Sequence, residues 1–135
     1  LAADTVEIAR WDLSLVLMMR DRAWPWLVLV PRRPGMRELH DLAAADRALL
    51  IEEIARASDA LRRAFAADKI NVGALGNLVP QLHVHVVARH VGDPAWPGPV
   101  WGAQPPSPLE EPELAARLTS IRAALDGAGA SVLQQ

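Results

Sequence analysis

The segment PQLHVHVVAR, residues 80–89, places two histidines two positions apart within an apolar run. Successive residues of a strand alternate between its two faces, so Gln81, His83 and His85 share one predicted face and apolar residues share the other. An amide and two imidazoles in one row are more than a half-buried strand needs for packing. The row is therefore the first candidate for a functional site.

The residues upstream of this segment predict a hairpin, a long helix and a further strand. Segments 11–20 and 26–32 are rich in branched apolar residues, and the turn-like DRAWP between them predicts an antiparallel pair. From about Ala44 to Ala67 apolar residues recur every three or four positions, which predicts an amphipathic helix. KINVGALG (69–76) is then expected to form a third strand and residues 81–90 a fourth.

Downstream, a loop and a last helix are expected. Residues 92–108 are rich in proline and glycine and include Trp96 and Trp101. The segment shows neither the hydrophobic period of a helix nor that of a strand, so it is predicted to be a loop. Its apolar surface is too large for a free linker, so we expect it to pack on the domain. An apolar stripe predicts a helix over about 111–126 that ends at Gly127. Together the elements predict an α+β fold, a mainly antiparallel sheet with a helix on one face.

The composition limits the class of protein. The chain has 135 residues, 51% of them hydrophobic, and a net charge of −2. One domain over residues 1–135 is expected, without nucleic acid or a membrane as partner. The absence of cysteine excludes disulfides and thiol catalysis. The apolar stretch 13–19 is far shorter than the ~20 residues of a membrane span, and no secretory signal is recognised, so a cytoplasmic location is expected.

Three interpretations of His83 and His85 are open from the residues alone. They can lie on the solvent side of a half-buried strand. They can bind a metal, but a cupin-like site needs a carboxylate four residues after His85, where Arg89 would repel a cation. In the third interpretation one neutral imidazole attacks phosphorus and the other stabilises charge on the phosphoryl oxygens. That chemistry needs no metal or cofactor.

The stretch QLHVHVV (81–87) resembles the signature of the histidine triad (HIT) superfamily of nucleotide hydrolases and nucleotidyl transferases, with glutamine in place of the first histidine. NVGALGNLVP (71–80) is similar to the family's Asn-x-Gly strand and phosphate-facing turn. LVLVPRR (27–33) and AWPGPVWG (95–102) are similar to two further family segments. The match to a bacterial subgroup with this Gln-for-His pattern implies a HIT-like fold of about five strands, one long helix and a C-terminal helix, with the triad region at 71–102.

The resemblance also implies roles for individual residues. His83 matches the middle histidine, which attacks the α-phosphorus and becomes transiently nucleotidylated. His85 matches the third, which donates to a phosphoryl oxygen or to the scissile bridge. Gln81 keeps the backbone carbonyl that fixes the tautomer of the nucleophile. Asn71 matches the polar residue that contacts the phosphate, and Asn77, in the turn before the triad, is a weaker candidate for the same role. A turn-forming role is equally open for both.

The activity implied by the resemblance is that of a metal-independent hydrolase or nucleotidyl transferase. Its substrate would be a nucleoside phosphoramidate, a dinucleoside polyphosphate or a related nucleotidyl compound, and no cofactor is expected. A catalytically weak nucleotide-binding module on the same scaffold is the alternative. A metal-dependent cupin-like enzyme is a third and weaker candidate.

Three further expectations concern assembly and supporting residues. The resemblance implies a homodimer in which the partner covers the Trp-rich loop 92–108. Trp26 stands where much of the family has a histidine behind the first triad histidine, so Trp26 and Gln81 are predicted to be hydrogen-bonded neighbours. His40 and His90 are expected to be surface histidines without a functional role.

Overall fold

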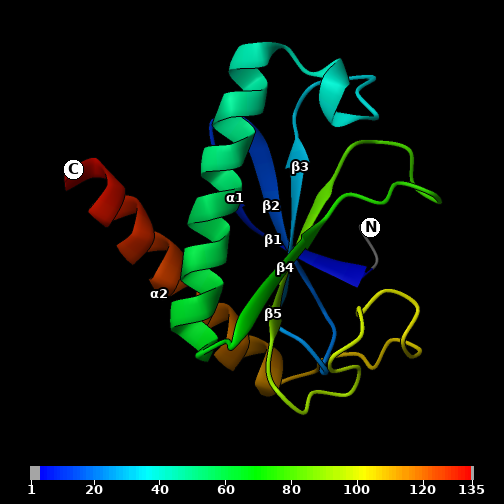
Figure 1. Ribbon diagram of the computed structural model, residues 1–135. Helices are drawn as coiled ribbons and strands as arrows, with labels where there is room; N and C mark the ends of the chain where they lie inside the picture. The colour runs from blue at the N-terminus through cyan, green and yellow to red at the C-terminus, as the bar shows by residue number, and fades with distance from the viewer. Residues whose placement is uncertain (1–3, 135) are drawn as a thin grey trace.

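Five antiparallel strands form one open sheet in the order β1-β2-β3-β5-β4. The computed structural model describes residues 4–134 (Figure 1). The strands are β1 (Thr5–Arg10), β2 (Ser14–Met19), β3 (Trp26–Pro31), β4 (Lys69–Gly73) and β5 (Val84–Arg89). The predicted hairpin is confirmed, because β2 and β3 pair antiparallel with Val16 opposite Leu29.

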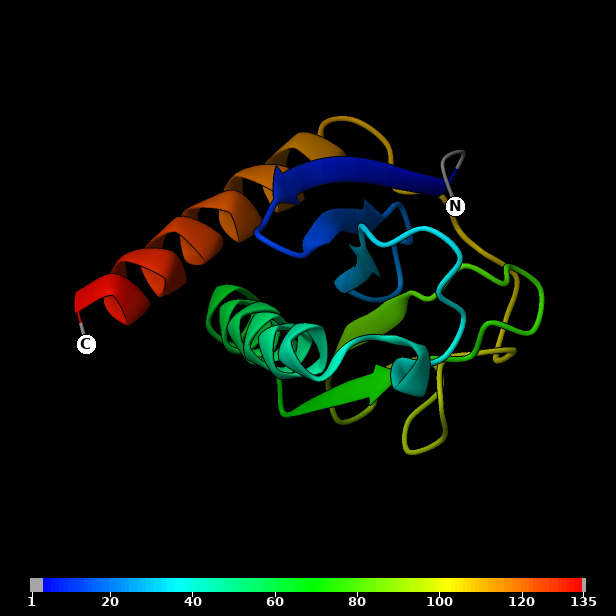
Figure 2. The same cartoon turned by 90° about the horizontal axis from the view of Figure 1, so that it is seen from above.

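One face of the sheet is covered by two helices, α1 (Ala44–Phe65) and α2 (Glu113–Gln134). Figure 2 shows α2 running past α1 on the β1 side of the sheet. Alternate residues of the central strands point to this face and pack against apolar residues of both helices, as the two-residue period requires. This core includes Val16, Met18, Leu27, Leu29, Val86, Ala88, Ala57, Leu61, Leu114 and Ile121. The predicted α+β class is thereby confirmed.

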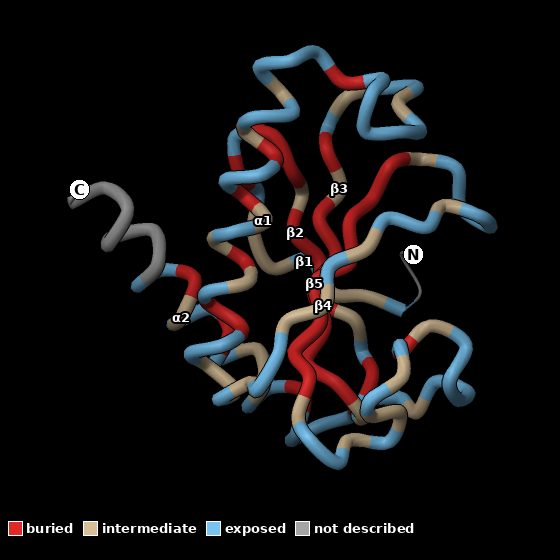
Figure 3. Tube along the Cα trace, in the orientation of Figure 1, coloured by how far each residue is buried: buried red, intermediate tan, exposed pale blue. Residues whose placement is uncertain are grey.

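The opposite face is covered by the loop that follows β5. A second apolar cluster lies there, made of Leu17, Trp24, Trp26, Val28, Val87 and Val100, with Trp101 packed against it. The predicted packing of segment 92–108 is confirmed by Val100 and Trp101. Figure 3 shows that the middle strands are buried along most of their length, while the loops around them are exposed. Both faces of β3 and β5 are thus inside the protein.

A buried carboxylate connects α1 to the turn between β1 and β2. Glu53 of α1 accepts hydrogen bonds at 3.0 Å from the backbone N–H groups of Leu13 and Ser14. These two N–H groups belong to a turn that the core covers, so they would otherwise lack partners. Glu53 therefore fixes the entry into β2 against the helix.

The structure corrects several predicted element bounds. β1 was not among the predicted segments: it has an ion pair between Glu7 and Arg10 and a bulge between Glu7 and Ala9, which disturb the period of two. β4 and β5 are shorter than predicted, so His83 immediately precedes its strand. The last helix continues past Gly127 to Gln134, because each of the two glycines in this alanine-rich helix, 127 and 129, costs only ~1 kcal/mol.

Among residues 4–134 no helix is long and apolar enough to cross a membrane.

Candidate active site

The two histidines lie at the start of β5 in the middle of the sheet. His85 is opposite Val28 of β3 on one side and Gly73 of β4 on the other. The rings of His83 and His85 are 5.0 Å apart between centroids and meet edge to face. Both residues are buried, with 6% and 8% exposed. The interpretation of both as solvent-side residues is therefore wrong.

The imidazole of His83 is held by a backbone atom. Its Nδ1 lies 2.7 Å from the carbonyl oxygen of Gln81. A carbonyl oxygen only accepts, so Nδ1 of His83 carries a proton, and in the neutral ring Nε2 has a free lone pair. This is the contact that the family resemblance implied for Gln81, and it uses the backbone of that residue and not its side chain.

The indole of Trp26 contacts the other histidine. Trp26 Nε1 donates to Nδ1 of His85 at 3.0 Å, and the two rings are 5.6 Å apart between centroids. Burial, and to a smaller extent the neighbouring His83, lower the pKa of His85 to about 4. His85 is therefore neutral at physiological pH.

The predicted pairing of Trp26 with Gln81 is wrong. Trp26 is opposite Val87 in the sheet, six residues along the chain from Gln81. A large ring reaches the diagonal neighbour two residues away, which is His85. The Gln81 side chain instead donates to the carbonyl oxygen of Arg33 at 3.4 Å.

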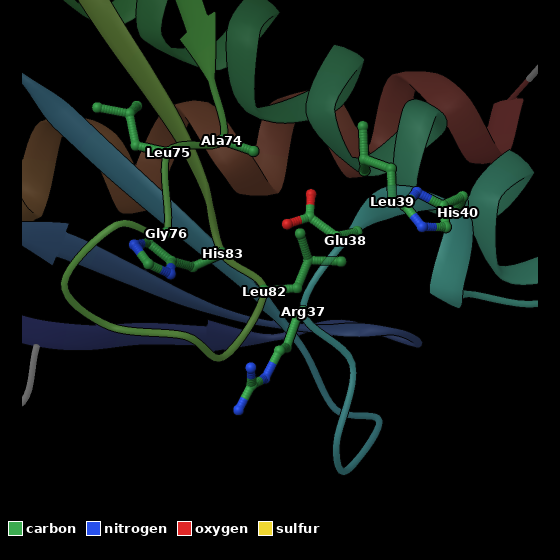
Figure 4. A pocket seen from close by; sticks show the side chains of 9 residues that line it. All are labelled: Arg37, Glu38, Leu39, His40, Ala74, Leu75, Gly76, Leu82 and His83. Atoms are coloured by element: carbon green, nitrogen blue, oxygen red, sulfur yellow. The ribbon is translucent and has the colours of Figure 1, made fainter.

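Two hollows meet at His83. The larger has a volume of about 370 Å³ and is lined by Leu75, Gly76, Asn77, Leu78, Val79, His83 and His85. The smaller has a volume of about 240 Å³ and is lined by Arg37, Glu38, Leu39, His40, Ala74, Leu75, Gly76, Leu82 and His83. Figure 4 shows His83 at one side of the smaller hollow and His40 at the other. A molecule bound at His83 can thus extend in two directions.

The two candidate asparagines are in different surroundings. Asn77 lines the larger hollow together with both histidines. Asn71 lines neither hollow; its Oδ1 accepts a hydrogen bond at 2.8 Å from Arg89. The structure therefore brings Asn77, but not Asn71, to the space beside His83.

A buried ion pair supports the end of β5. Arg89 donates two hydrogen bonds to Asp93, at 2.8 and 2.9 Å, and its guanidinium lies over the ring of Trp96. The Arg89 guanidinium holds the pKa of the Asp93 carboxyl well below its usual range. This pair was missed at the sequence level, where Arg89 was weighed only as an obstacle to a metal site. The sequence feature that could have indicated the pair is Asp93, an acidic residue four positions after Arg89, with which the strand ends.

The loop tryptophans have contacts within their own chain. The ring of Trp101 meets those of Trp26 and His85 at centroid distances of 6.3 and 5.7 Å. Trp96 lies under Arg89. Contacts within the chain cover these two rings in part, since both residues are half-buried, and the expectation that a partner protomer covers the rest stays a prediction.

The remaining histidines differ in environment. His90 lies near the end of α1, with its Nε2 2.8 Å from the carbonyl oxygen of Phe65. His40 is exposed and borders the smaller hollow. In the part of the chain that the structure describes, no group of three or more His, Asp or Glu side chains is arranged to hold a metal ion.

Comparison with known proteins identifies the class. The family model of the HIT domain matches residues 2–92, so the chain belongs to the HIT domain family. The fold is similar to that of histidine triad proteins from Bradyrhizobium japonicum (46% identity, 92% of each chain covered, TM-score 0.88) and Marinobacter aquaeolei VT8 (45% identity, 95% of this chain and 93% of that chain covered, TM-score 0.90). A further histidine triad protein, from Sinorhizobium meliloti 1021, is 44% identical over 91% of each chain, with a TM-score of 0.88. No curated protein sequence matches the chain significantly.

These findings confirm the predicted HIT-like fold, an open antiparallel sheet with a long helix and a C-terminal helix. Cupins have a double-sheet fold. The cupin-like interpretation is therefore wrong. Members of the HIT family are in general nucleotide-binding proteins and nucleotide hydrolases or transferases.

Proposed function

We propose that the protein is a metal-independent hydrolase or nucleotidyl transferase that acts at the α-phosphorus of a nucleotidyl compound through a nucleotidyl-His83 intermediate. The observation that carries the proposal is the 2.7 Å contact between Nδ1 of His83 and the Gln81 carbonyl. It leaves the Nε2 lone pair of His83 free for attack, in a residue that borders both hollows.

The proposed reaction has two displacements. Nε2 of His83 attacks the α-phosphorus, the bond to the leaving group breaks, and the leaving group takes its proton from water. Charge on the phosphoryl oxygens is stabilised by the neighbouring N–H donor of His85. Water then attacks the phosphorus and breaks its bond to His83, which releases the nucleoside monophosphate and a proton to solvent and restores the His83 imidazole.

The larger hollow favours an uncharged leaving group. Leu75, Leu78 and Val79 line it, and Leu78 is 95% exposed. No lysine or arginine is among its lining residues. A polyphosphate would bring several negative charges that need cations, whereas the amine of a nucleoside phosphoramidate can pack on apolar side chains. Among the candidate substrates we therefore favour a phosphoramidate with an apolar amine.

Trapping the intermediate tests this function. A nucleoside phosphoramidate labelled at phosphorus is mixed with stoichiometric protein and quenched with alkali, which preserves a histidine–phosphorus bond. We expect label on the wild-type chain and on a His90→Gln variant, and none on a His83→Gln variant. His90 is a matched control because it lies outside both hollows.

The alternative, a catalytically weak binding module, gives a different result in the same experiment. Nucleotide would bind to the wild type, as calorimetry would measure, but no label would remain on the chain. That combination would overturn the proposed activity.

A further inference from the structure

We propose that Trp26 is a positioning residue that fixes the ring orientation and the tautomer of His85, so that His85 presents Nε2–H to the substrate. The tautomer is a property of the free protein, whereas its effect on turnover rests on the proposed function. Neither the family match nor the sequence pattern assigns this role, since both point to the triad positions themselves.

The hydrogen-bond chemistry of the two rings carries the assignment. An indole Nε1–H is a donor only, and it lies 3.0 Å from Nδ1 of His85. Nδ1 must therefore offer a lone pair. In a neutral imidazole the other nitrogen then carries the proton, so Nε2 of His85 is a donor. An imidazolium has two N–H donors and cannot make this bond.

The packing keeps both rings in place. Trp26 is buried, and Trp24 and Trp101 meet it edge-on at centroid distances of 6.4 and 6.3 Å. Trp101 also packs against His85, and it does so directly above Gly73 of β4. A Cβ at Gly73 would lie 3.0 Å from the Trp101 ring, so a larger residue there would push the ring away by a few tenths of an ångström. His85 is thus enclosed by aromatic rings that oppose its rotation.

His83 and His85 consequently hold their protons on opposite nitrogens. The Gln81 carbonyl keeps the proton of His83 on Nδ1, and the Trp26 indole keeps that of His85 on Nε2. One ring offers a lone pair and the other an N–H, with centroids 5.0 Å apart. A nucleophile beside a donor is the pair that attack at phosphorus requires.

The groups that surround His85 leave it in this state over a wide pH range. β3 contributes Trp26 and Val28, β4 contributes Gly73, and the loop contributes Trp101, none of which titrates. The titratable neighbour is His83. Burial and His83 together lower the pKa of His85 to about 4, which agrees with the neutral form that the indole bond demands.

Histidine NMR of the protein without substrate tests the tautomer. In long-range proton–nitrogen spectra at pH 7 we expect His85 to show a protonated Nε2 and an unprotonated Nδ1. Trp26→Phe, which keeps an aromatic ring but removes the donor, should give a mixture of tautomers. Trp11→Phe is the matched control, because Trp11 is a buried indole of the helix-side core and should leave His85 unchanged. A wild-type His85 protonated at Nδ1, or an unchanged tautomer in Trp26→Phe, would overturn the assignment.

Kinetics separates this inference from the proposed function. For Trp26→Phe we expect kcat to fall roughly tenfold or more, with KM within about threefold, because part of the population loses the Nε2–H donor that stabilises charge on the phosphoryl oxygens. The acid limb of the pH–rate profile should move to higher pH, and Trp26→His, which restores a donor, should recover part of kcat. A wild type without turnover but with the expected NMR pattern would refute the proposed function and leave the tautomer assignment intact. If Trp26→Phe does not fold, Trp26→His and the wild-type spectrum still decide the tautomer.

Discussion

The backbone carbonyl of Gln81 holds the proton of His83 on Nδ1, which leaves Nε2 with a lone pair. The indole of Trp26 occupies Nδ1 of His85, which leaves the proton of His85 on Nε2. His83→Ala should therefore abolish the chemical step and leave the rest of the binding surface intact. We expect turnover to fall by several orders of magnitude while nucleotide affinity stays within about tenfold, because the lost interaction belongs to the transition state. Steady-state kinetics and calorimetry measure the two quantities. Equal losses in both would argue against a nucleophilic role.

The side chain of Gln81 should contribute little to catalysis, although it occupies a triad position. Its backbone carbonyl holds His83, and its amide makes a long bond to Arg33. In Gln81→Ala the carbonyl remains, so we expect kcat within about threefold and a loss of about 0.5–1.5 kcal/mol in the free energy of unfolding. Kinetics and urea titration measure these changes. A well-folded Gln81→Ala protein with kcat reduced more than tenfold would contradict this view.

The sequence predicted those parts of the site that lie within one segment of the chain, residues 81–85. The period of two placed Gln81, His83 and His85 in one row, while the contact of the Gln81 carbonyl with His83 was implied by the family resemblance. The partner of Trp26 could not be predicted, because it depends on the register between β3 and β5, which no local pattern encodes. A slip of two residues would have brought a different side chain to the indole.

At the scale of elements, the sequence predicted the strands and helices whose apolar residues recur with a regular period. The hairpin of β2 and β3 and the helix α1 have regular periods and clear ends. β1 was not predicted because its bulge and its charged residues break the alternation. The predicted end of α2 at Gly127 is wrong, because a glycine ends a helix only where the backbone turns left-handed. In α1 that position is Ala66, with φ of 50°.

One carboxylate of α1 should be important for stability. Glu53 accepts from two buried backbone N–H groups, those of Leu13 and Ser14. Glu53→Ala leaves both without a partner, and we expect the free energy of unfolding to fall by about 2–4 kcal/mol. Glu52→Ala, at the exposed neighbouring position of α1, is the control and should change stability by less than about 0.5 kcal/mol. Chemical denaturation measures both, and similar values for the two variants would show that the bonds contribute little.

For the whole molecule, the buried His85 should make stability depend on pH. Its pKa is lowered from 6.5 to about 4 in the folded state, so the unfolded chain binds the proton more tightly. Stability is then fully present above about pH 6.5 and decreases as the pH falls towards 4. His85→Gln should flatten this part of the profile, as thermal unfolding between pH 4 and 7 would measure. An unchanged slope in the variant would assign the effect to another group.

The assembly of the molecule is the second whole-molecule prediction, and it follows from the family. β4 forms one edge of the sheet, and Val72 on it is 48% exposed. An edge with an exposed apolar residue can pair with a second copy. We expect a homodimer by light scattering at micromolar concentration, and a monomer for Val72→Glu. Val91→Glu, an exposed position after β5, is the control and should remain a dimer. A monomeric wild type would refute the prediction.

The aromatic enclosure of His85 also makes the site visible to optical spectroscopy. The chain has five tryptophans and no tyrosine, and three of the five, Trp24, Trp26 and Trp101, lie in one cluster beside His85. Ultraviolet emission therefore originates largely from indoles at the site, and a protonated imidazole or a stacked purine quenches such emission. Occupancy of the site and the charge of His85 should both be readable from the intrinsic fluorescence of the unmodified protein, with no attached dye.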